Sequence, residues 1–527
     1  MIPIVRLFKA EIAILGSGFG GSLLASIARR LGRTVLIIER GGHPRFAIGE
    51  SSTPLANLLL ENLAQKYDLP RLRPLSKWGT WQQSYPSMAC GLKRGFTFYH
   101  HQLGRRFKPE PDRLNELMVA ASPHDRVADT HWYRQEFDHF LLREAQALGA
   151  DYLDASDVRE MIEEERGIRL RVVREEETFS VEARFVIDAS GPRGAIHRLL
   201  GFTDISSFPR TAGIFSHFTG VKRLESFSEF HQPATPPYPP DDAALHHVFE
   251  GGWIWVLRFN NGITSAGAAM TKAVAERLGG ANDAALAWTR LLELFPTVRD
   301  QFAEAKSIVP FVHAHPLAFH TSTVVGRNWA MLPSAAGFVD PLLSTGFPLT
   351  LLGIERLGKV IAELEDTARM GSLLAKYEAT THLELAVTEE LVAALYASMG
   401  NFESFSALSL LYFAAASYAE TCLRLGKPRY GFLLSQRPEF LEGMRSCCAL
   451  ARAGEFQQVR GRVTEVIEQF DVAGLSGWDR QNWYPVLASD LLASAPKLGV
   501  SEKAIQALLE KCGFFDATNE GKICLKD

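Results

Sequence analysis

Three segments of the chain share one pattern, in which a short apolar run leads into small residues and then into a stretch of helical period. In the first, at 10–40, "EIAIL" precedes a glycine-rich turn and a helical pattern, and a second apolar run, "TVLIIE", closes the segment. The others lie at 183–201 ("ARFVIDASGPRGAIHRLLG") and at 328–364, where a long helix is predicted to begin near residue 344. Short apolar runs that alternate with helices predict a buried parallel sheet.

The pattern changes between and after these segments. Residues 205–325 lack the strand–helix alternation and contain the proline-rich run "QPATPPYPPDD", which favours strands joined by loops. From about residue 380 the period is helical. We therefore predict an α/β protein with a discontinuous nucleotide-binding domain (1–204 and 326–375), an inserted, mostly β substrate domain (205–325) and an α-helical C-terminal domain (376–527).

Composition narrows the class of protein. The 527 residues are 46% hydrophobic and carry a net charge of −4, which is not the basic footprint of a nucleic-acid or membrane-surface binder. The longest apolar run, 408–419, is shorter than the roughly 20 residues of a membrane span. The six cysteines have no metal-ligand spacing, so no metal site is expected. With no export segment expected at the N-terminus, the chain is predicted to be cytoplasmic.

The glycine-rich turn of the first segment has the chemistry of a dinucleotide site. Gly16, Gly18 and Gly21 form G-x-G-x-x-G directly after a strand. In that motif the first glycine permits the tight turn, the second lets a pyrophosphate approach the backbone, and the third allows close helix–strand packing. The positive end of the helix favours the phosphates. Glu39 ends the second strand, where a carboxylate can accept hydrogen bonds from a ribose.

Aromatic residues recur at alternate positions in two other stretches. Trp253 and Trp255 in "EGGWIWVLRF" must point to the same face of a strand. Two indoles on one face favour the wall of a cavity for a flat aromatic ligand over simple core packing. In "CGLKRGFTFYHH", Lys93 precedes Phe96 and Phe98, which share a face by the same rule.

In this order and at these spacings, the segments resemble the FAD-dependent aromatic hydroxylase superfamily, and within it the flavin-dependent halogenases, over about residues 8–370. The resemblance implies a Rossmann-like FAD-binding domain of the GR2 type with an inserted β-sheet domain. It implies that "GESSTP" (49–54) lies beside the flavin ring and that N–H groups of "FVDPLLSTG" (338–346) hold a halide. The residues so implied for FAD are Gly16, Gly18, Phe19, Gly20, Gly21, Glu39, Arg40, Glu50, Ser51, Arg134, Ser334, Asp340 and Gly346, and those for chloride or bromide are Ser344, Thr345 and Gly346.

The resemblance also implies a catalytic lysine. Halogenases of this kind use a buried lysine to capture or orient hypohalous acid, and Lys93 takes that place, with Lys77 in "LSKWGTW" as the alternative. Trp253 and Trp255 resemble the W-x-W motif of halogenases and a related stretch of prenyl-lipid reductases. With Phe96 and Phe98 they are expected to line the substrate cavity.

Two departures from the halogenase pattern keep other activities open. Arg258 stands where the tryptophan motif has proline, either as a surface residue paired with an acid or as an inward partner for an acidic or tethered substrate. Pro333-Ser334 replaces Gly-Asp, which leaves a weaker, neutral hydrogen bond for the flavin.

We therefore predict an enzyme that halogenates an electron-rich aromatic of phenol, pyrrole or indole type, free or on a carrier protein. Its reduced FAD would come from a separate flavin reductase. A monooxygenase of the same superfamily is the alternative, and a prenyl-lipid reductase is a third interpretation.

Overall fold

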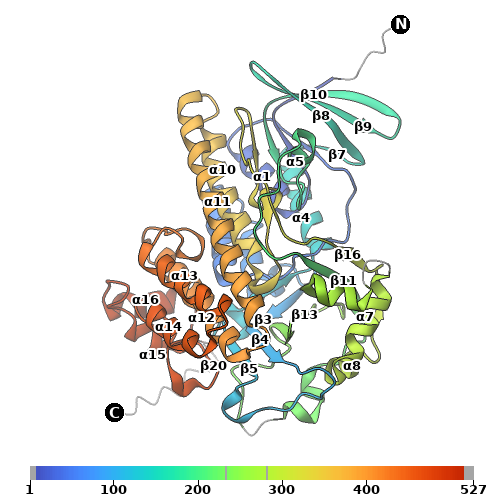
Figure 1. Ribbon diagram of the computed structural model, residues 1–527. Helices are drawn as coiled ribbons and strands as arrows, with labels where there is room; N and C mark the ends of the chain where they lie inside the picture. Colours follow the sequence, from blue (N-terminus) through green and yellow to red (C-terminus); the bar gives the residue numbers. More distant parts are fainter. Residues whose placement is uncertain (1–6, 232–233, 280–282, 516–527) are drawn as a thin grey trace.

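The computed structural model describes residues 7–231, 234–279 and 283–515 (Figure 1). Its first sheet has the strand order β7-β2-β1-β10-β9-β8, with β18 beside β10. Five strands are mutually parallel: β1 (Leu7–Leu15), β2 (Val35–Ile38), β7 (Asp151–Leu153), β10 (Glu177–Asp188) and β18 (Trp329–Met331). The hairpin of β8 (Ser156–Glu164) and β9 (Gly167–Arg174) continues the sheet in antiparallel fashion from the first half of β10.

The parallel strands are apolar on both faces because helices cover them. All four residues of β2 and the last four of β1 are buried, as expected for strands inside an α/β layer. The helices of this region are α1 (Phe19–Arg30), α2 (Pro54–Lys66), α3 (Trp78–Ser84), α4 (Arg134–Ala147), α5 (Ala195–Leu200), α9 (Pro333–Ala336) and α10 (Gly346–Ala362). The three strand–turn segments of the sequence thus form one doubly covered sheet, and the predicted Rossmann-like fold class is confirmed.

The second sheet has nine strands in the order β15-β11-β14-β13-β12-β4-β5-β20, with β16 beside β11. They are β4 (Gly95–His100), β5 (Glu116–Ala120), β11 (Thr211–Thr219), β12 (Ala244–Phe249), β13 (Gly252–Arg258), β14 (Thr264–Thr271), β15 (Lys306–Ser307), β16 (Val312–Ala314) and β20 (Trp483–Tyr484). Two short pairs lie apart from it, β3 (Cys90–Lys93) with β6 (Asp129–Trp132) and β17 (Phe319–His320) with β19 (Gly337–Phe338).

The second sheet draws on all three of the predicted regions rather than on 205–325 alone. β4 and β5 precede that region and β20 follows it. The region also contains three helices, α6 (Lys272–Leu278), α7 (Ala284–Glu293) and α8 (Pro296–Gln301). They bury residues such as Trp288 and Leu291 against one face of the sheet, because an apolar sheet face must be covered.

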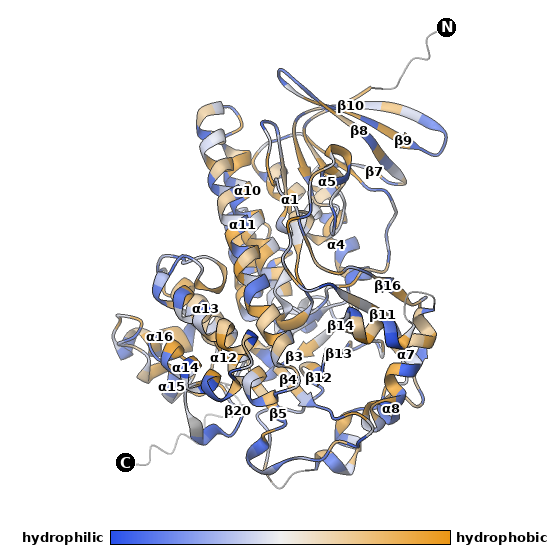
Figure 2. Cartoon of the chain, viewed as in Figure 1, coloured by the Kyte–Doolittle hydropathy of each residue, from blue (hydrophilic) through white to orange (hydrophobic). Residues whose placement is uncertain are grey.

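Helices form the rest of the chain: α11 (Thr367–Ser398), α12 (Phe402–Arg424), α13 (Pro438–Arg452), α14 (Phe456–Ile467), α15 (Ala488–Ala493) and α16 (Glu502–Cys512). The expected boundary at 375/376 falls inside α11, a single helix that packs on α10 and also on α12 and α13. Figure 2 shows polar and apolar residues intermixed along these helices, as in helices that bury one face. Within the described ranges, no helix is long and apolar enough to cross a membrane.

Candidate functional site

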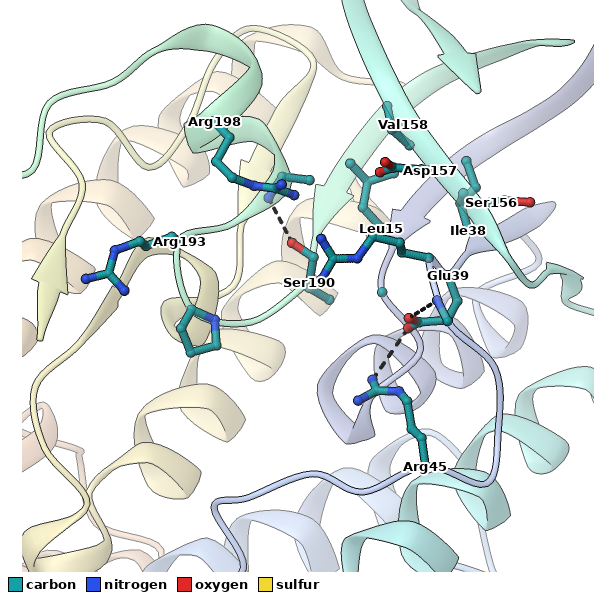
Figure 3. Close-up of a pocket in the computed structure, with 16 residues that line it drawn as sticks. Leu15, Ile38, Glu39, Arg45, Ser156, Asp157, Val158, Ser190, Arg193 and Arg198 are labelled. Atoms are coloured by element: carbon teal, nitrogen blue, oxygen red, sulfur yellow. Dashed lines mark hydrogen bonds and ion pairs between the residues drawn. The ribbon is translucent and has the colours of Figure 1, made fainter. Parts of the chain in front are cut away.

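A cavity of about 470 Å³ lies at the carboxyl ends of β1, β2 and β10. In Figure 3, Glu39 and Arg45 face each other at one end of it, and Arg193 and Arg198 belong to the segment that follows β10. This edge of a parallel sheet is where α/β proteins bind nucleotides. A carboxylate for a ribose and several guanidinium groups for phosphates suit a dinucleotide there.

Two positions of the glycine-rich turn have no room for any residue but glycine. Gly16 has φ +100°, and a Cβ there would lie 2.6 Å from the carbonyl oxygen of Ala189. A Cβ on Gly21 would lie 2.1 Å from the carbonyl oxygen of Gly16. Gly18 is the N-cap of α1 and has φ −64°, a value that any residue adopts. Its lack of a side chain leaves the backbone in front of the helix accessible.

The residues beside these glycines face the protein interior. The Phe19 ring is buried, with its centroid 5.6 Å from that of Trp132 and 5.0 Å from that of Phe347. Gly20 faces Leu332. Phe19 and Gly20 can therefore meet a cofactor through their backbone, while the ring of Phe19 belongs to the core.

Glu39 is buried at the end of β2 and accepts several hydrogen bonds. It accepts from the Ser17 N–H at 2.9 Å, the Ser17 hydroxyl at 2.8 Å and the Gly41 N–H at 2.9 Å. Burial alone would raise the pKa of Glu39, but the charge of Arg45 and these donors hold it below its usual range. The group is therefore a carboxylate at neutral pH. Arg40 is exposed on the same cavity.

Arg134 anchors the loop that contains the GESSTP segment. Its guanidinium pairs with Asp138 at 2.6 Å and donates to the carbonyl oxygens of Ile48 and Gly49 at 3.1 and 2.9 Å. In that loop Glu50 is buried, and its Oε1 lies 2.8 Å from Nε2 of His217. The other oxygen, Oε2, is buried without a hydrogen-bond partner in the part of the chain described.

Lys93 is fully buried at the end of β3, in contact with the same loop. Its Nζ donates to the Ser51 hydroxyl at 2.8 Å and to the Ser52 carbonyl, and it lies 3.8 Å from the centroid of the Phe96 ring. Burial lowers the pKa of Lys93, and the carboxylate of Asp129 opposes that effect. Three residues that the sequence singled out, Lys93, Ser51 and Phe96, are thus in contact. Lys77, the alternative, is only half-buried and precedes α3.

One face of the second sheet carries a continuous row of rings. Phe96 and Phe98 are stacked with centroids 6.3 Å apart, and Phe98 stacks on His246 at 4.4 Å. His246 is 5.1 Å from Trp253, which is 5.6 Å from Trp255. The rings are buried, and Phe98 also meets Phe405 of α12. Of the four residues expected to line the substrate cavity, Phe96 lines the second cavity described below, whereas Phe98, Trp253 and Trp255 are packed in the core.

The third motif is joined to this row of rings through Asp340. The carboxylate of Asp340 accepts from Nε1 of Trp253 at 3.2 Å, from the Tyr396 hydroxyl at 2.8 Å and from the Leu342 N–H at 3.0 Å. Burial raises the pKa of Asp340 to about 7, although these donors lower it. Nothing in the sequence pattern singled out Tyr396 or His246. Both reach the site only because α11 and β12 pack there.

The predicted halide segment has an unusual backbone. Leu343 and Ser344 have φ of +63° and +56°, a region that residues with a side chain seldom adopt and that is found at functional sites. Thr345 follows as the N-cap of α10, and a Cβ on Gly346 would meet nothing within 4 Å. The open helix start suits an anion. Ser334 lies half-buried in α9.

A second cavity, of about 190 Å³, lies between the C-terminal helices and the end of β5. Phe96 lines it, so this cavity shares a ring with Lys93. The sequence did not predict it, because most of its wall comes from helices that gave no motif. The residues that line this cavity include Thr53, Pro54, Lys77, Val119, Tyr412, Phe413, Ala416, Glu420, Thr421 and Arg424.

Arg258 has a structural role. It pairs with the buried Asp241 and donates to the carbonyl oxygens of Val221, at 3.0 Å, and Lys222. The interpretation of Arg258 as an inward partner for an acidic substrate is wrong, because the guanidinium already has its acceptors within the protein.

Comparison with known proteins agrees with the geometry. The family model described as tryptophan halogenase matches residues 129–404. The tetracycline 7-halogenase of Kitasatospora aureofaciens is 28% identical over 348 residues, which cover 64% of this chain and 61% of that protein. The monodechloroaminopyrrolnitrin halogenase PrnC of Pseudomonas fluorescens is 27% identical over 411 residues, covering 76% and 70%. The crystal structure of halogenase PltM in complex with phloroglucinol and FAD has the same fold, with a TM-score of 0.78 at 24% identity over 90% of this chain and 99% of that one.

Proposed function

Because the chain belongs to the tryptophan halogenase family, we propose that it uses reduced FAD, dioxygen and a halide to halogenate a small electron-rich aromatic. The observation that carries the proposal is the environment of Lys93. Its buried ammonium group touches the GESSTP loop on one side and the Phe96 ring on the other, and that ring lines a cavity.

The residues at the first cavity suit FAD. The turn at Gly16 and Gly21 has no room for a side chain, the start of α1 can receive the pyrophosphate, and Glu39 and Arg40 line the cavity expected for the adenosine end. The unpartnered Glu50 Oε2 is an acceptor in the loop expected beside the flavin ring. When bound, reduced FAD supplies the reaction with dioxygen that oxidises the halide.

Lys93 acts on the oxidised halide. Ser51 and the Ser52 carbonyl hold two of its N–H groups, and an ammonium has three donors. The remaining donor can orient hypohalous acid by a hydrogen bond to its oxygen, in a place from which burial excludes bulk water.

The second cavity is the proposed substrate site, and its size limits the substrate. A cavity of about 150 Å³ holds benzene, and about 190 Å³ therefore suits one ring with small substituents. Glu420 and Thr421 in its wall can accept hydrogen bonds from a hydroxyl or a ring N–H. We infer a free phenol or pyrrole as substrate, with a carrier-bound aromatic as the alternative.

The activity is tested by product mass. Purified protein, FAD, a separate flavin reductase with NADH, oxygen and bromide or chloride are incubated with phenols, pyrroles and indoles, free or as carrier thioesters. We expect gain of a halogen on free single-ring substrates, and none when the reductase is left out. Gain of one oxygen instead would favour the monooxygenase, for which Ser334 in place of aspartate is the supporting observation.

Lys93→Ala should abolish halogenation while reoxidation of reduced FAD continues at the wild-type rate, because the lysine acts after oxygen has reacted. Lys77→Ala is the matched control and should retain most of the turnover, since Lys77 is a half-buried residue of the cavity wall, whereas Lys93 is the amine that Ser51 and Ser52 hold. The reverse ranking of the two variants would move the catalytic assignment to Lys77.

We also infer that the protein works in the cytoplasm, where a flavin reductase can supply it. Among the described residues Cys90, Cys422, Cys447, Cys448 and Cys512 are free thiols, which is usual in a reducing compartment.

A further inference from the structure

A buried carboxylate stands opposite the catalytic lysine. In the antiparallel pair of β3 and β6, Lys93 is the direct partner of Asp129. Asp129 is 5% exposed. The Asn57 amide donates to Asp129 Oδ1 at 2.8 Å and to the Ser52 hydroxyl at 3.0 Å. The Ser52 carbonyl accepts from Lys93 Nζ, so Ser52 connects the acid to the amine, through its hydroxyl on one side and its carbonyl on the other.

The other oxygen of Asp129 has no hydrogen-bond partner among the described residues. A buried carboxylate left without compensation is costly, so a cation must offset it. Burial raises the pKa of Asp129 to about 7 and lowers that of Lys93 to about 7, and the charge of each group opposes the shift of the other. Each group therefore stabilises the ionised form of the other.

The other charged or titratable groups near Lys93 and Asp129 do not take the place of the partner that each has in the other. His131 and His246 lie near Lys93, and burial lowers the pKa of each to about 3, so both are neutral. Tyr412 faces Asp129, and burial raises its pKa, so it is neutral as well. Glu420 and Arg424 also act on Asp129, but they are paired with each other at 2.8 Å.

We propose that Asp129 is a positioning residue that keeps Lys93 in the ammonium form, with the Asn57 amide linking Asp129 to Ser52 of the segment that holds Lys93. The proposal rests on the function proposed above. An ammonium can donate a hydrogen bond to hypohalous acid and has no lone pair to attack the halogen, so the oxidised halide stays available for the substrate.

The charge of Lys93 can be measured without turnover. In the full chain labelled with [¹³Cε]lysine, without FAD, the Lys93 resonance is assigned by its loss in Lys93→Met and followed against pH. We expect Asp129→Asn to lower the Lys93 midpoint by at least 1 pH unit, because the carboxylate that favours the ammonium is gone. Asp129→Glu should keep the midpoint near that of the wild type.

Turnover supplies a second readout. In Asp129→Asn the basic limb of the pH profile of kcat should move to lower pH by a similar amount, and the Kd for FAD should not change. Asp241→Asn is the control, because it removes another buried carboxylate, paired with Arg258, and should leave both readouts in place.

An unchanged Lys93 midpoint in Asp129→Asn overturns the proposal, as does a shift of the acidic limb in place of the basic one, which would make the neutral amine the active form. If the midpoint moves as expected but wild-type protein yields no halogenated product, the Asp129–Lys93 pairing stands and the proposed function is wrong.

Discussion

The buried carboxylates around the site differ in what compensates their charge. Glu39 is held by backbone N–H groups and Arg45 and stays ionised. Asp340 has only neutral donors, and burial raises its pKa to about 7. Asp129 depends on a lysine. A buried carboxylate can therefore have different roles according to its partners. Glu39 is the proposed cofactor ligand, Asp340 links a strand to a helix, and Asp129 is the proposed partner of the Lys93 charge.

Glu39→Ala should weaken FAD binding about 10- to 100-fold, because a hydrogen bond to a charged group contributes about 1.5–3 kcal/mol. Isothermal titration of FAD measures this. Glu182→Ala, which removes a surface ion pair with Lys9 from the same sheet, is the control and should bind FAD normally. Wild-type affinity in Glu39→Ala would contradict the assignment of the first cavity to the cofactor.

At the scale of elements, Asp340 joins three of them. The aspartate lies in the connection to α10, and it binds Trp253 of β13 and Tyr396 of α11. The strained backbone at Leu343 and Ser344 follows directly. A strand, a long helix and the proposed halide segment are thus fixed to one another through a single side chain.

The raised pKa of Asp340 predicts the pH dependence of stability. The folded protein holds this proton up to about pH 7, whereas the unfolded chain loses it near the ordinary value of 3.8. This contribution is therefore complete below pH 3.8 and is lost as the pH rises through 7, at about 1.4 kcal/mol per unit of pKa difference.

Thermal melts without FAD test this. Asp340→Asn should flatten the fall in Tm between pH 4 and 7, while Asp283→Asn, at an exposed helix cap, should not. A wild-type slope in Asp340→Asn would show that the carboxylate is ionised in the folded protein.

At the scale of the whole molecule, α12 closes the second cavity over Phe96. The helix packs on α2, which begins at the end of the GESSTP segment, and on α14 in the C-terminal region, so the proposed cofactor and substrate sites draw on parts of the chain that are far apart in sequence. In Figure 1 the C-terminal helices lie against the second sheet, beside β4 and β5.

A larger side chain in that cavity should weaken binding of the aromatic substrate without changing the affinity for FAD. Ala416→Phe, on the cavity side of α12, should raise KM for the aromatic at least tenfold and leave FAD affinity unchanged, because the added ring occupies substrate space. Steady-state kinetics with FAD titration measure both. Ala449→Phe on the exposed side of α13 should have neither effect, and normal KM in Ala416→Phe would place the substrate elsewhere.

The dinucleotide-binding segment could be predicted from the amino-acid sequence. Strand, glycine turn, helix and Glu39 lie within 10–40, and the backbone limits that select Gly16 and Gly21 act between near neighbours. Alternation likewise fixed the shared face of Phe96 and Phe98 and that of Trp253 and Trp255, because the period of a strand is local.

The partners that face these residues follow from the packing of distant segments. Asp129 became the partner of Lys93 through the register of two short strands distant in sequence. Arg258, the last residue of β13, found Asp241 in the turn before β12. The cavity beside Phe96 exists because helices from the C-terminal region cover it. Such contacts depend on which segments, far apart in the sequence, pack together, and a local pattern of residues does not specify the partner segment.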